Sequence, residues 1–270
     1  MHDHMRLDFP TSHEHIPRLM SARADFGDRS KIEGGRLRAN ATRAVRVVSA
    51  LGLLLLFGCG GDDGIGVDDA GGIVRTPDPS NPLMNPAAFD EPAPEVFRAR
   101  FETSKGDFVI EVHRDWAPIG ADQFFNLVKN GYYDDVRFFR VLDGFVAQFG
   151  MHGDPFVNQA WENHPIPDDP VTRSNLRGFV TFAKSSAPDS RTTQVFINFV
   201  DNSHLDDAGF APFGQVEEGM DVVDQLFSGY GDTPVQQNIA TRGNDYLTAG
   251  FPNLDYVQQA SIVLPAMGGL

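Results

Sequence analysis

One arginine in this sequence is surrounded by aromatic and amide residues that could support chemistry. Arg140 follows a pair of phenylalanines, and Phe145 and Gln148 come soon after it. Two later segments, residues 194–196 and 205–213, carry more glutamine, phenylalanine and leucine. A guanidinium stays charged at any working pH and donates several hydrogen bonds. The set therefore offers a cationic donor beside apolar side chains.

Other familiar kinds of catalytic site are missing from the sequence. It has no Gly-x-Ser-x-Gly elbow, Walker lysine loop, His-Glu-x-x-His pair or dinucleotide fingerprint. The single cysteine, Cys59, precedes this whole region, so a nucleophile would have to be a serine with no evident partner. The later histidines are scattered, which predicts no metal site: His113, His152, His164 and His204. We therefore expect chemistry without a metal or a cofactor.

The charge of the chain argues against a nucleic-acid partner. The 270 residues contain 22 Lys+Arg against 37 Asp+Glu, a formal charge of −15. A phosphate backbone requires a basic face, which this composition does not offer. The charge also changes sign along the chain, because residues 1–59 hold nine Lys+Arg against six Asp+Glu. This change indicates two segments with different fates.

The junction between these segments has the pattern of an export signal. Arg43 and Arg46 precede the apolar run 47–57, which is too short to span a bilayer and ends at Gly58 and Cys59. The end of the run resembles the lipobox of bacterial lipoproteins, which implies that Cys59 is lipidated. Residues 1–58 are then an N-terminal extension and signal peptide. The alternative is a buried core helix followed by an inert thiol.

Lipidation of Cys59 would anchor the chain to a bacterial membrane on the extracytoplasmic side. Gly60 follows the cysteine in place of aspartate, which favours the outer membrane with the chain facing the periplasm. Residues 59–94 are rich in Gly, Asp and Pro. Such a composition buries too little apolar surface to offset the entropy of ordering. We therefore expect a solvated tether up to Pro94.

The elements that must position Arg140 begin after this tether, in a predicted domain of residues 95–270. Apolar residues alternate over 97–101 and 108–112, which predicts a β-hairpin. Pro118 begins a predicted helix that ends at Gly131, and a second helix is expected after Gly219. Only short apolar runs lie between the two helices. This pattern predicts an antiparallel barrel or sandwich closed by two helices.

The segments around Arg140 resemble the cyclophilin family of peptidyl-prolyl cis/trans isomerases. The resemblance runs from about residue 97 to 227, with a last strand near 257–264. It implies a mainly β fold, a closed eight-stranded antiparallel β-barrel capped by two α-helices. It also implies an enzyme that acts on proline-containing polypeptides. We further expect the chain to be a monomer. The segments 151–171 and 230–255 look like loops found in many bacterial members.

The family's functional residues can be matched to this sequence position by position. The resemblance places the catalytic set at Arg140, Phe145 and Gln148. Lys184 stands where the family has asparagine, and His204 stands where it often has tryptophan. Phe210 takes the place of a pocket histidine. The substrate-binding set implied by the resemblance is Val146, Ala183, Lys184, Gln194, Phe196, His204, Leu205, Phe210 and Phe213.

Two other functions remain open for the same residues. The first is a proline-peptide binding or chaperone-like envelope lipoprotein with this fold but without turnover, in which Lys184 and His204 have altered the groove. The second is a structural lipoprotein whose barrel binds a neighbour. The second alternative predicts that Arg140, Gln148 and Phe196 do not share one pocket.

Overall fold

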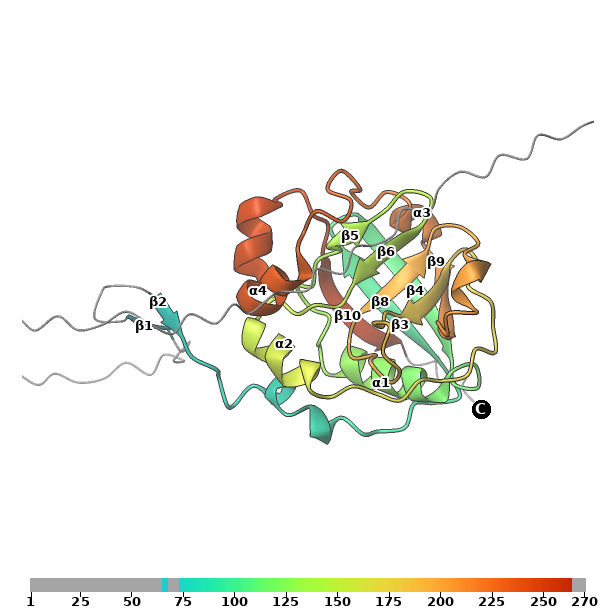
Figure 1. Cartoon of the computed structure of the whole chain (residues 1–270), viewed down its shortest axis with the longest axis horizontal. Coiled ribbons are helices and arrows are strands. Elements are labelled where there is room, and N and C mark those ends of the chain that lie inside the picture. The colour runs from blue at the N-terminus through green and yellow to red at the C-terminus, as the bar shows by residue number, and fades with distance from the viewer. Residues whose placement is uncertain (1–64, 68–72, 264–270) are drawn as a thin grey trace, which may run out of the picture. The chain divides into compact units, whose positions relative to one another are not determined.

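The computed structural model describes residues 65–67 and 73–263 (Figure 1). The predicted signal peptide and Cys59 lie outside the described residues. The first two strands, β1 (Ile65–Val67) and β2 (Ile73–Arg75), form a small antiparallel pair. None of the helices within 73–263 is long and apolar enough to cross a membrane.

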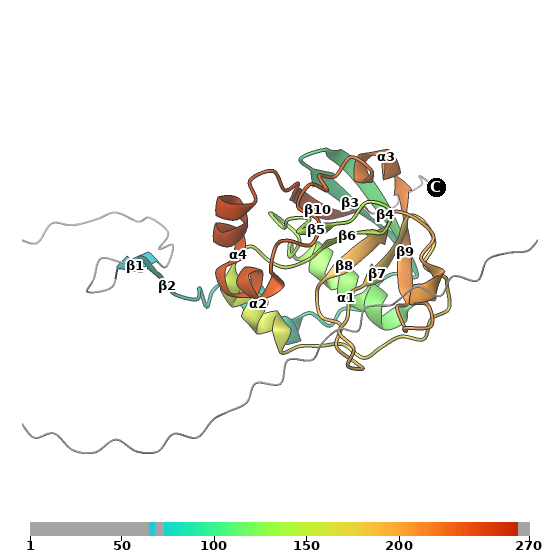
Figure 2. The same ribbon diagram turned by 45° about the horizontal axis from the view of Figure 1, so that its top comes forward.

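The other eight strands form one antiparallel sheet that surrounds the core. Their order across the sheet is β10-β3-β4-β9-β7-β8-β6-β5. The sheet is strongly curled, as Figure 2 shows. The strands are β3 (Val96–Thr103), β4 (Gly106–His113), β5 (Arg140–Val141), β6 (Val146–Phe149), β7 (Phe179–Phe182), β8 (Val195–Asn198), β9 (Pro212–Glu218) and β10 (Val257–Val263).

The curled sheet does not close into a complete barrel. Its edge strands are β10 and β5, which do not pair with each other over the described residues. The chain just before β5 approaches β10 instead: Phe138 N donates to Asp255 O at 2.9 Å, and Val257 N donates to Val136 O at 2.9 Å. Because β5 has only two residues, it cannot extend this contact into a ladder. The prediction of a closed barrel is therefore overstated, and the sheet is a half-barrel.

The expected hairpin and first helix are confirmed. In β3 the side chains alternate between exposed and buried positions, and the turn into β4 includes Gly106 at a φ of +129°. The helix α1 (Pro118–Lys129) begins at its proline and is followed by Gly131 at a φ of +71°. It packs against β4, β9 and β10. The positive φ values explain why glycine occupies both turns.

Aromatic rings fill the core between α1 and the sheet. Phe101 and Phe108 stack with centroids 5.1 Å apart, and Phe124 of α1 packs 4.8 Å from Phe213 of β9. All four side chains are almost completely buried. Burying a side chain of this size contributes about 1.5–3 kcal/mol to the free energy of unfolding. This core makes the curled sheet a stable support for its more exposed face.

The second expected helix is much shorter than predicted, and two helices lie where loops were expected. The helix α3 (Met220–Val223) has only four residues. Helix α2 (Pro155–Glu162) and helix α4 (Gln236–Gly250) lie in the two predicted loops and pack against each other (Figures 1 and 2). In α4 the buried residues are Ile239, Gly243 and Leu247, which share one face at a spacing of four residues. Only two of them are large apolar side chains, so the helical signal in the sequence is weak. The glycine also kinks it, with φ 55° and ψ −140°.

The prediction of a solvated tether up to Pro94 is wrong for residues 81–94. This segment contains two short 3-10 helices, η1 (Pro82–Met84) and η2 (Pro86–Ala88), and it packs against the domain. Leu83 is 8% exposed, and its carbonyl accepts a hydrogen bond from the Trp161 indole at 2.9 Å. Phe89 packs edge-on against the same indole. The apolar side chains among the prolines reach a tertiary partner in α2, which composition alone did not reveal.

Candidate active site

Three neighbouring strands place Arg140, Gln148 and Phe196 in one row. Arg140 of β5 lies directly opposite Gln148 of β6, and Gln148 lies opposite Phe196 of β8. Residues that are directly opposite in paired strands project from the same face of a sheet. Arg140 and Phe196 are 56 residues apart in the sequence. The strand register nevertheless places them on the same face of the sheet, on either side of Gln148.

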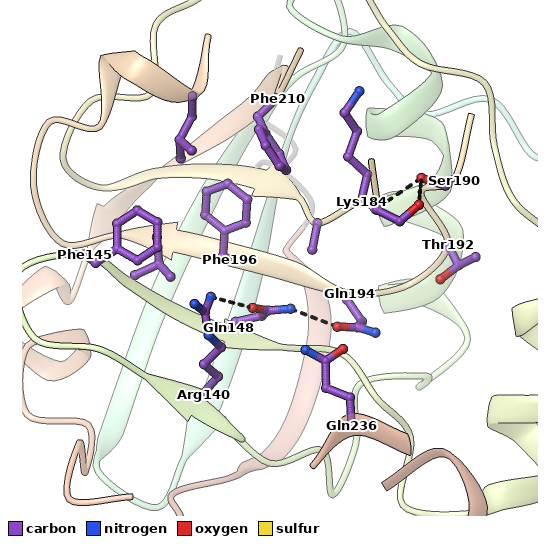
Figure 3. A pocket seen from close by; sticks show the side chains of 14 residues that line it. Arg140, Phe145, Gln148, Lys184, Ser190, Thr192, Gln194, Phe196, Phe210 and Gln236 are labelled. Atoms are coloured by element: carbon purple, nitrogen blue, oxygen red, sulfur yellow. Dashed lines mark hydrogen bonds between the residues drawn. The ribbon is translucent and has the colours of Figure 1, made fainter. Parts of the chain in front are cut away.

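A chain of hydrogen bonds fixes the polar side of this row (Figure 3). Arg140 Nη1 donates to Gln148 Oε1 at 3.2 Å, and Gln148 Nε2 donates to Gln194 Oε1 at 2.9 Å. The guanidinium carbon also lies 5.8 Å from the centroid of the Phe145 ring. The first bond uses one of the five N–H donors of the guanidinium. Gln148 thus orients the arginine and leaves it donors for a ligand.

These side chains border a cavity of about 430 Å³. Its apolar side includes Phe196 and Phe210, whose rings meet edge to face with centroids 5.8 Å apart. Figure 3 shows the arginine and the glutamines across the cavity from these rings. The lining residues are Arg140, Phe145, Val146, Gln148, Ala183, Lys184, Ser185, Ser190, Thr192, Gln194, Phe196, Leu205, Phe210 and Gln236.

Most of the residues expected to form the site line this cavity. Of the twelve named from the sequence, His204 and Phe213 do not. His204 is exposed, and its ring stacks beside Phe145 with centroids 6.1 Å apart. Arg140, Gln148 and Phe196 all line this cavity. A purely structural lipoprotein was expected to keep these three residues in separate places, so this alternative is not supported.

The assignment of Phe213 to the pocket is corrected by its burial. The side chain is 0% exposed and packs against Phe124 and Phe182, with ring centroids 4.8 Å and 5.1 Å away. Alternate residues of a strand face opposite sides of the sheet. At its position in β9, Phe213 faces the core under α1, so it supports the sheet from behind and cannot contact a ligand.

Lys184, which replaces an asparagine, is held at one edge of the cavity. Its ammonium pairs with Asp168 Oδ2 at 3.1 Å and lies 5.9 Å from the Phe210 ring centroid. Burial favours a higher pKa for Asp168, but the hydrogen bond from Asp189 N and the Lys184 ammonium together lower that pKa. Asp168 therefore stays ionised at neutral pH, and its contact with the ammonium limits the motion of the lysine.

A buried arginine connects this edge of the cavity to α1. Arg191 is 2% exposed and donates through Nη2 to Asp169 Oδ2 at 3.0 Å. The same carboxylate accepts the backbone N–H groups of Ile119 and Gly120 at 3.1 Å and 2.8 Å. An aspartate at a helix N-terminus satisfies donors that the helix leaves unpaired. The segment that carries Thr192 and Gln194 is thereby tied to the first helix.

Buried asparagines position the aromatic residues, and sequence reasoning missed their role. Asn202 Nδ2 donates to Phe145 O at 3.0 Å and to Asn198 Oδ1 at 2.9 Å. Asn175 Nδ2 donates to Phe210 O at 2.8 Å. Two loops that carry cavity residues are therefore held by side-chain amides. Nothing local marks these asparagines as buried, because their partners are distant in sequence.

Four more lining residues were not expected: Ser185, Ser190, Thr192 and Gln236. The first three are common polar types in a connecting segment, so composition carries no signal for them. Gln236 begins α4, in a segment interpreted as a loop. Among the described residues, no group of three His, Cys, Asp or Glu side chains is placed to hold a metal ion.

Comparison with known proteins identifies the family. Residues 98–243 match the model of the cyclophilin type peptidyl-prolyl cis-trans isomerase family. A peptidyl-prolyl cis-trans isomerase of Acinetobacter baylyi is 39% identical over 130 residues, which cover 46% of this chain and 69% of that protein. Peptidyl-prolyl cis-trans isomerase B of Escherichia coli is 36% identical over 134 residues, which cover 47% and 81%.

A solved cyclophilin structure from Hirschia baltica aligns with 64% of this chain and 79% of its own, at a TM-score of 0.49 and 19% identity. The family model spans more than half of the chain, and it includes the strands that carry Arg140, Gln148 and Phe196. The chain therefore belongs to the cyclophilin-type peptidyl-prolyl cis-trans isomerases.

Proposed function

We propose that this isomerase acts on X-Pro bonds of exported polypeptides, as a monomer anchored at Cys59 to the periplasmic face of the outer membrane. Within the domain, we assign catalysis to Arg140, Phe145 and Gln148. The observation that carries this assignment is the hydrogen bond that holds Arg140 at the wall of an aromatic cavity. The anchor and the location rest on the sequence around Cys59 alone.

The reaction needs a donor and an apolar pocket, but no nucleophile. Rotation about a peptide bond has a barrier of about 18–20 kcal/mol, because resonance gives the C–N bond partial double-bond character. Uncatalysed X-Pro isomerisation therefore takes tens to hundreds of seconds. In the twisted transition state the proline nitrogen regains its lone pair. A donor aimed at that nitrogen stabilises the transition state more than either planar ground state.

Arg140 is the donor that this cavity offers. Its guanidinium is always charged, and the Gln148 amide keeps it in one orientation. Preorganisation matters because a donor already in place needs no rearrangement as the lone pair forms. The Phe145 ring lies close to the guanidinium and restricts water on one side of it. This arrangement needs neither a metal nor a cofactor.

The aromatic side of the cavity suits a proline ring. Phe196 is 6% exposed and forms an edge-to-face pair with Phe210, while Leu205 and Val146 add aliphatic surface. Apolar surroundings strengthen the electrostatic effect of the arginine because they lower the local dielectric constant. Gln194, which is bonded to Gln148, offers further hydrogen-bonding groups to the substrate backbone.

A peptide assay on the purified full chain tests the catalytic assignment. We expect the chain to accelerate cis-trans exchange of an Ala-Pro peptide, measured by NMR exchange spectroscopy at equilibrium. Peptide binding measured in parallel distinguishes an isomerase from a binding protein. Binding without any acceleration of exchange would overturn the proposal in favour of a chaperone-like module.

A second experiment tests the membrane anchor. When the chain is expressed in a Gram-negative bacterium, we expect incorporation of a labelled fatty acid and recovery in the outer-membrane fraction. Both should be lost in Cys59→Ser, which changes only one atom of the side chain. An unlabelled and soluble wild-type chain would show that the anchor is absent, whatever the result of the peptide assay.

A further inference from the structure

Gln194 ends the hydrogen-bond chain that orients Arg140, and its own position depends on the residue before it. Its Oε1 accepts a hydrogen bond from Gln148 Nε2 at 2.9 Å (Figure 3). Its backbone carbonyl accepts one from Ala183 N at 2.9 Å, which ties this residue to the end of β7. Thr193 precedes it directly. Groups that fix Thr193 therefore also fix the far end of the chain that orients the arginine.

Two buried tyrosine hydroxyls from the segment after α1 hold Thr193. Tyr132 Oη donates to Thr193 Oγ1 at 3.1 Å, and Thr193 Oγ1 donates in turn to Gly150 O at 2.8 Å. Tyr133 Oη donates to Thr193 O at 3.0 Å. Both tyrosine side chains are 0% exposed, and Thr193 is 4% exposed. The side chain and the carbonyl of Thr193 are thus both bonded inside the protein.

The backbone around Thr193 also lies directly against the end of β6. Gly150 follows this strand at a φ of +108°, and a Cβ there would lie 2.5 Å from Thr193 O and 2.8 Å from Gln194 Cα. Only glycine permits this approach. From the other side, Gln123 Nε2 of α1 donates to Thr192 O at 3.0 Å. Residues 192–194 are therefore fixed between α1 and the strand that carries the other glutamine of the chain.

The two tyrosines are suited to a fixed role as donors. Burial raises the pKa of Tyr132 and of Tyr133 above the ordinary value, so both hydroxyls keep their protons at neutral pH. The ring of Tyr133 packs against Phe124 and Phe149, with centroids 5.6 Å away from each. The ring of Tyr132 packs edge-on against Trp161 at 5.3 Å. Rings held in this way keep their hydroxyls in one place.

We propose that the hydroxyls of Tyr132 and Tyr133 are positioning groups for Arg140. They act through Thr193 and Gln194, and neither tyrosine lines the cavity or contacts a ligand in it. The inference rests on the proposed function, because it takes the arginine as the catalytic donor. It extends the working parts of the site to side chains buried behind the cavity.

Removing one hydroxyl at a time tests the proposal by separating kcat from KM. For an Ala-Pro peptide, Tyr132→Phe and Tyr133→Phe should each lower kcat about two- to tenfold, the range for one lost hydrogen bond. KM should change less than about twofold, because the aromatic walls that bind the planar peptide are untouched. Both constants come from NMR exchange on the full chain at several peptide concentrations, with variants shown to be folded by circular dichroism.

The control for these variants is Tyr256→Phe, which makes the same chemical change beside Arg137 and outside the cavity. It should keep the wild-type kcat and KM. Unchanged kcat in both Tyr132→Phe and Tyr133→Phe would overturn the proposal. A higher KM at constant kcat would also overturn it, because the hydroxyls would then shape only the binding of the peptide.

Two substitutions of Thr193 separate hydrogen bonding from packing. Thr193→Val keeps the shape of the side chain but loses the hydroxyl, so kcat should fall at least as far as in Tyr132→Phe. Thr193→Ser keeps the hydroxyl and should retain most of the wild-type kcat. A role in packing alone predicts the reverse order, because valine fills the space better than serine. That reverse order would exclude the hydroxyl chain as the cause.

A double-mutant cycle tests whether the effect passes through Gln194. Tyr132→Phe should lower kcat in the wild type but cause little further loss in Gln194→Leu, because the two changes disrupt one unit. Equal fold losses in both backgrounds would show that removal of the hydroxyl loosens the domain in general, which contradicts a positioning role.

The side-chain amide of Gln148 gives a readout that does not depend on turnover. Its proton–nitrogen NMR signals are assigned by their loss in Gln148→Leu. Tyr132→Phe should shift them, while Tyr256→Phe should not. Unshifted signals in Tyr132→Phe would overturn the proposal. If the wild type does not accelerate isomerisation, the proposed function fails, and these signals still decide whether the hydroxyls position the chain.

Discussion

The amide of Gln148 accepts a hydrogen bond from Arg140 across the β5–β6 pair at 3.2 Å, and the two residues are direct register partners. The same amide donates to Gln194 at 2.9 Å. Gln148 therefore orients Arg140, and Gln194 in turn fixes the amide of Gln148. The polar side of the cavity is thus ordered without a substrate. Such preorganisation is what electrostatic stabilisation of a transition state requires.

Replacing Arg140 should remove most of the catalysis. We expect Arg140→Ala to lower kcat/KM for an Ala-Pro peptide about 10²- to 10³-fold, the usual cost of losing a transition-state donor. Arg140→Lys keeps the charge but loses the planar fork, so it should recover only part of this loss. Arg100→Ala, on the exposed face of β3, is the control and should be unaffected. Wild-type exchange rates in Arg140→Ala would contradict the assignment.

Gln148 should act largely through Arg140. Gln148→Leu removes both of its hydrogen bonds with little change in volume, and we expect kcat/KM to fall about 10- to 100-fold. In the double variant with Arg140→Ala, the two effects should not add, because each disrupts the same unit. The measurement is a double-mutant cycle on kcat/KM. Independent, additive effects would show that the hydrogen bond between these residues does not matter for turnover.

His152 should make stability depend on pH. Burial lowers its pKa from 6.5, against the opposing effect of Asp154 and two further carboxylates, and its Nδ1 accepts a hydrogen bond from Asp154 N at 2.9 Å. Because the folded state disfavours the proton, the contribution of this residue to stability is complete above pH 6.5. It is lost as the pH falls from 6.5 toward the lower folded-state pKa.

The effect is measured by urea unfolding of the wild type and His152→Asn between pH 7.5 and 5. The free energy of unfolding of the wild type should fall more steeply below pH 6.5, by at most about 1.4 kcal/mol per pH unit for one proton. The other histidines are common to both proteins, so they cancel in the comparison. Parallel curves would show that His152 does not titrate differently in the two states.

The segment before the sheet should stabilise the domain. Leu83→Ala removes a side chain that is 8% exposed in contact with the main core, and we expect the free energy of unfolding to decrease by about 2–4 kcal/mol. Leu176→Ala makes the same change at a side chain that is 40% exposed, so its effect should be much smaller. Denaturant midpoints compare the two. Equal midpoints for Leu83→Ala and the wild type would show that residues 81–94 do not stabilise the domain and are part of the solvated tether.

Much of the catalytic side could be predicted from the sequence because its signals are local. Arg140, Phe145 and Gln148 lie within nine residues of one another, and the resemblance to the family's motif in this segment assigned all three to the site. The helix that begins at Pro118 and ends just before Gly131 could likewise be predicted from the sequence. Phe213 was wrongly assigned to the pocket by the match to the family's motif, and its apolar neighbours in the sequence fit a core equally well. Only the direction of its side chain from β9 separates the two.

The sequence by itself determined the family, the residue types around Arg140 and the mainly β architecture. Each of these depends on patterns that repeat every two residues or occur within short motifs. The tertiary structure alone decided that the sheet stops short of closure, that residues 81–94 belong to the domain, and that α4 reaches the groove at Gln236. These features depend on contacts between residues far apart in the chain, such as Leu83 with Trp161 and Gly243 with Gly153. The helix or strand propensity of a short segment does not depend on such distant partners, and tertiary packing commonly overrides that propensity.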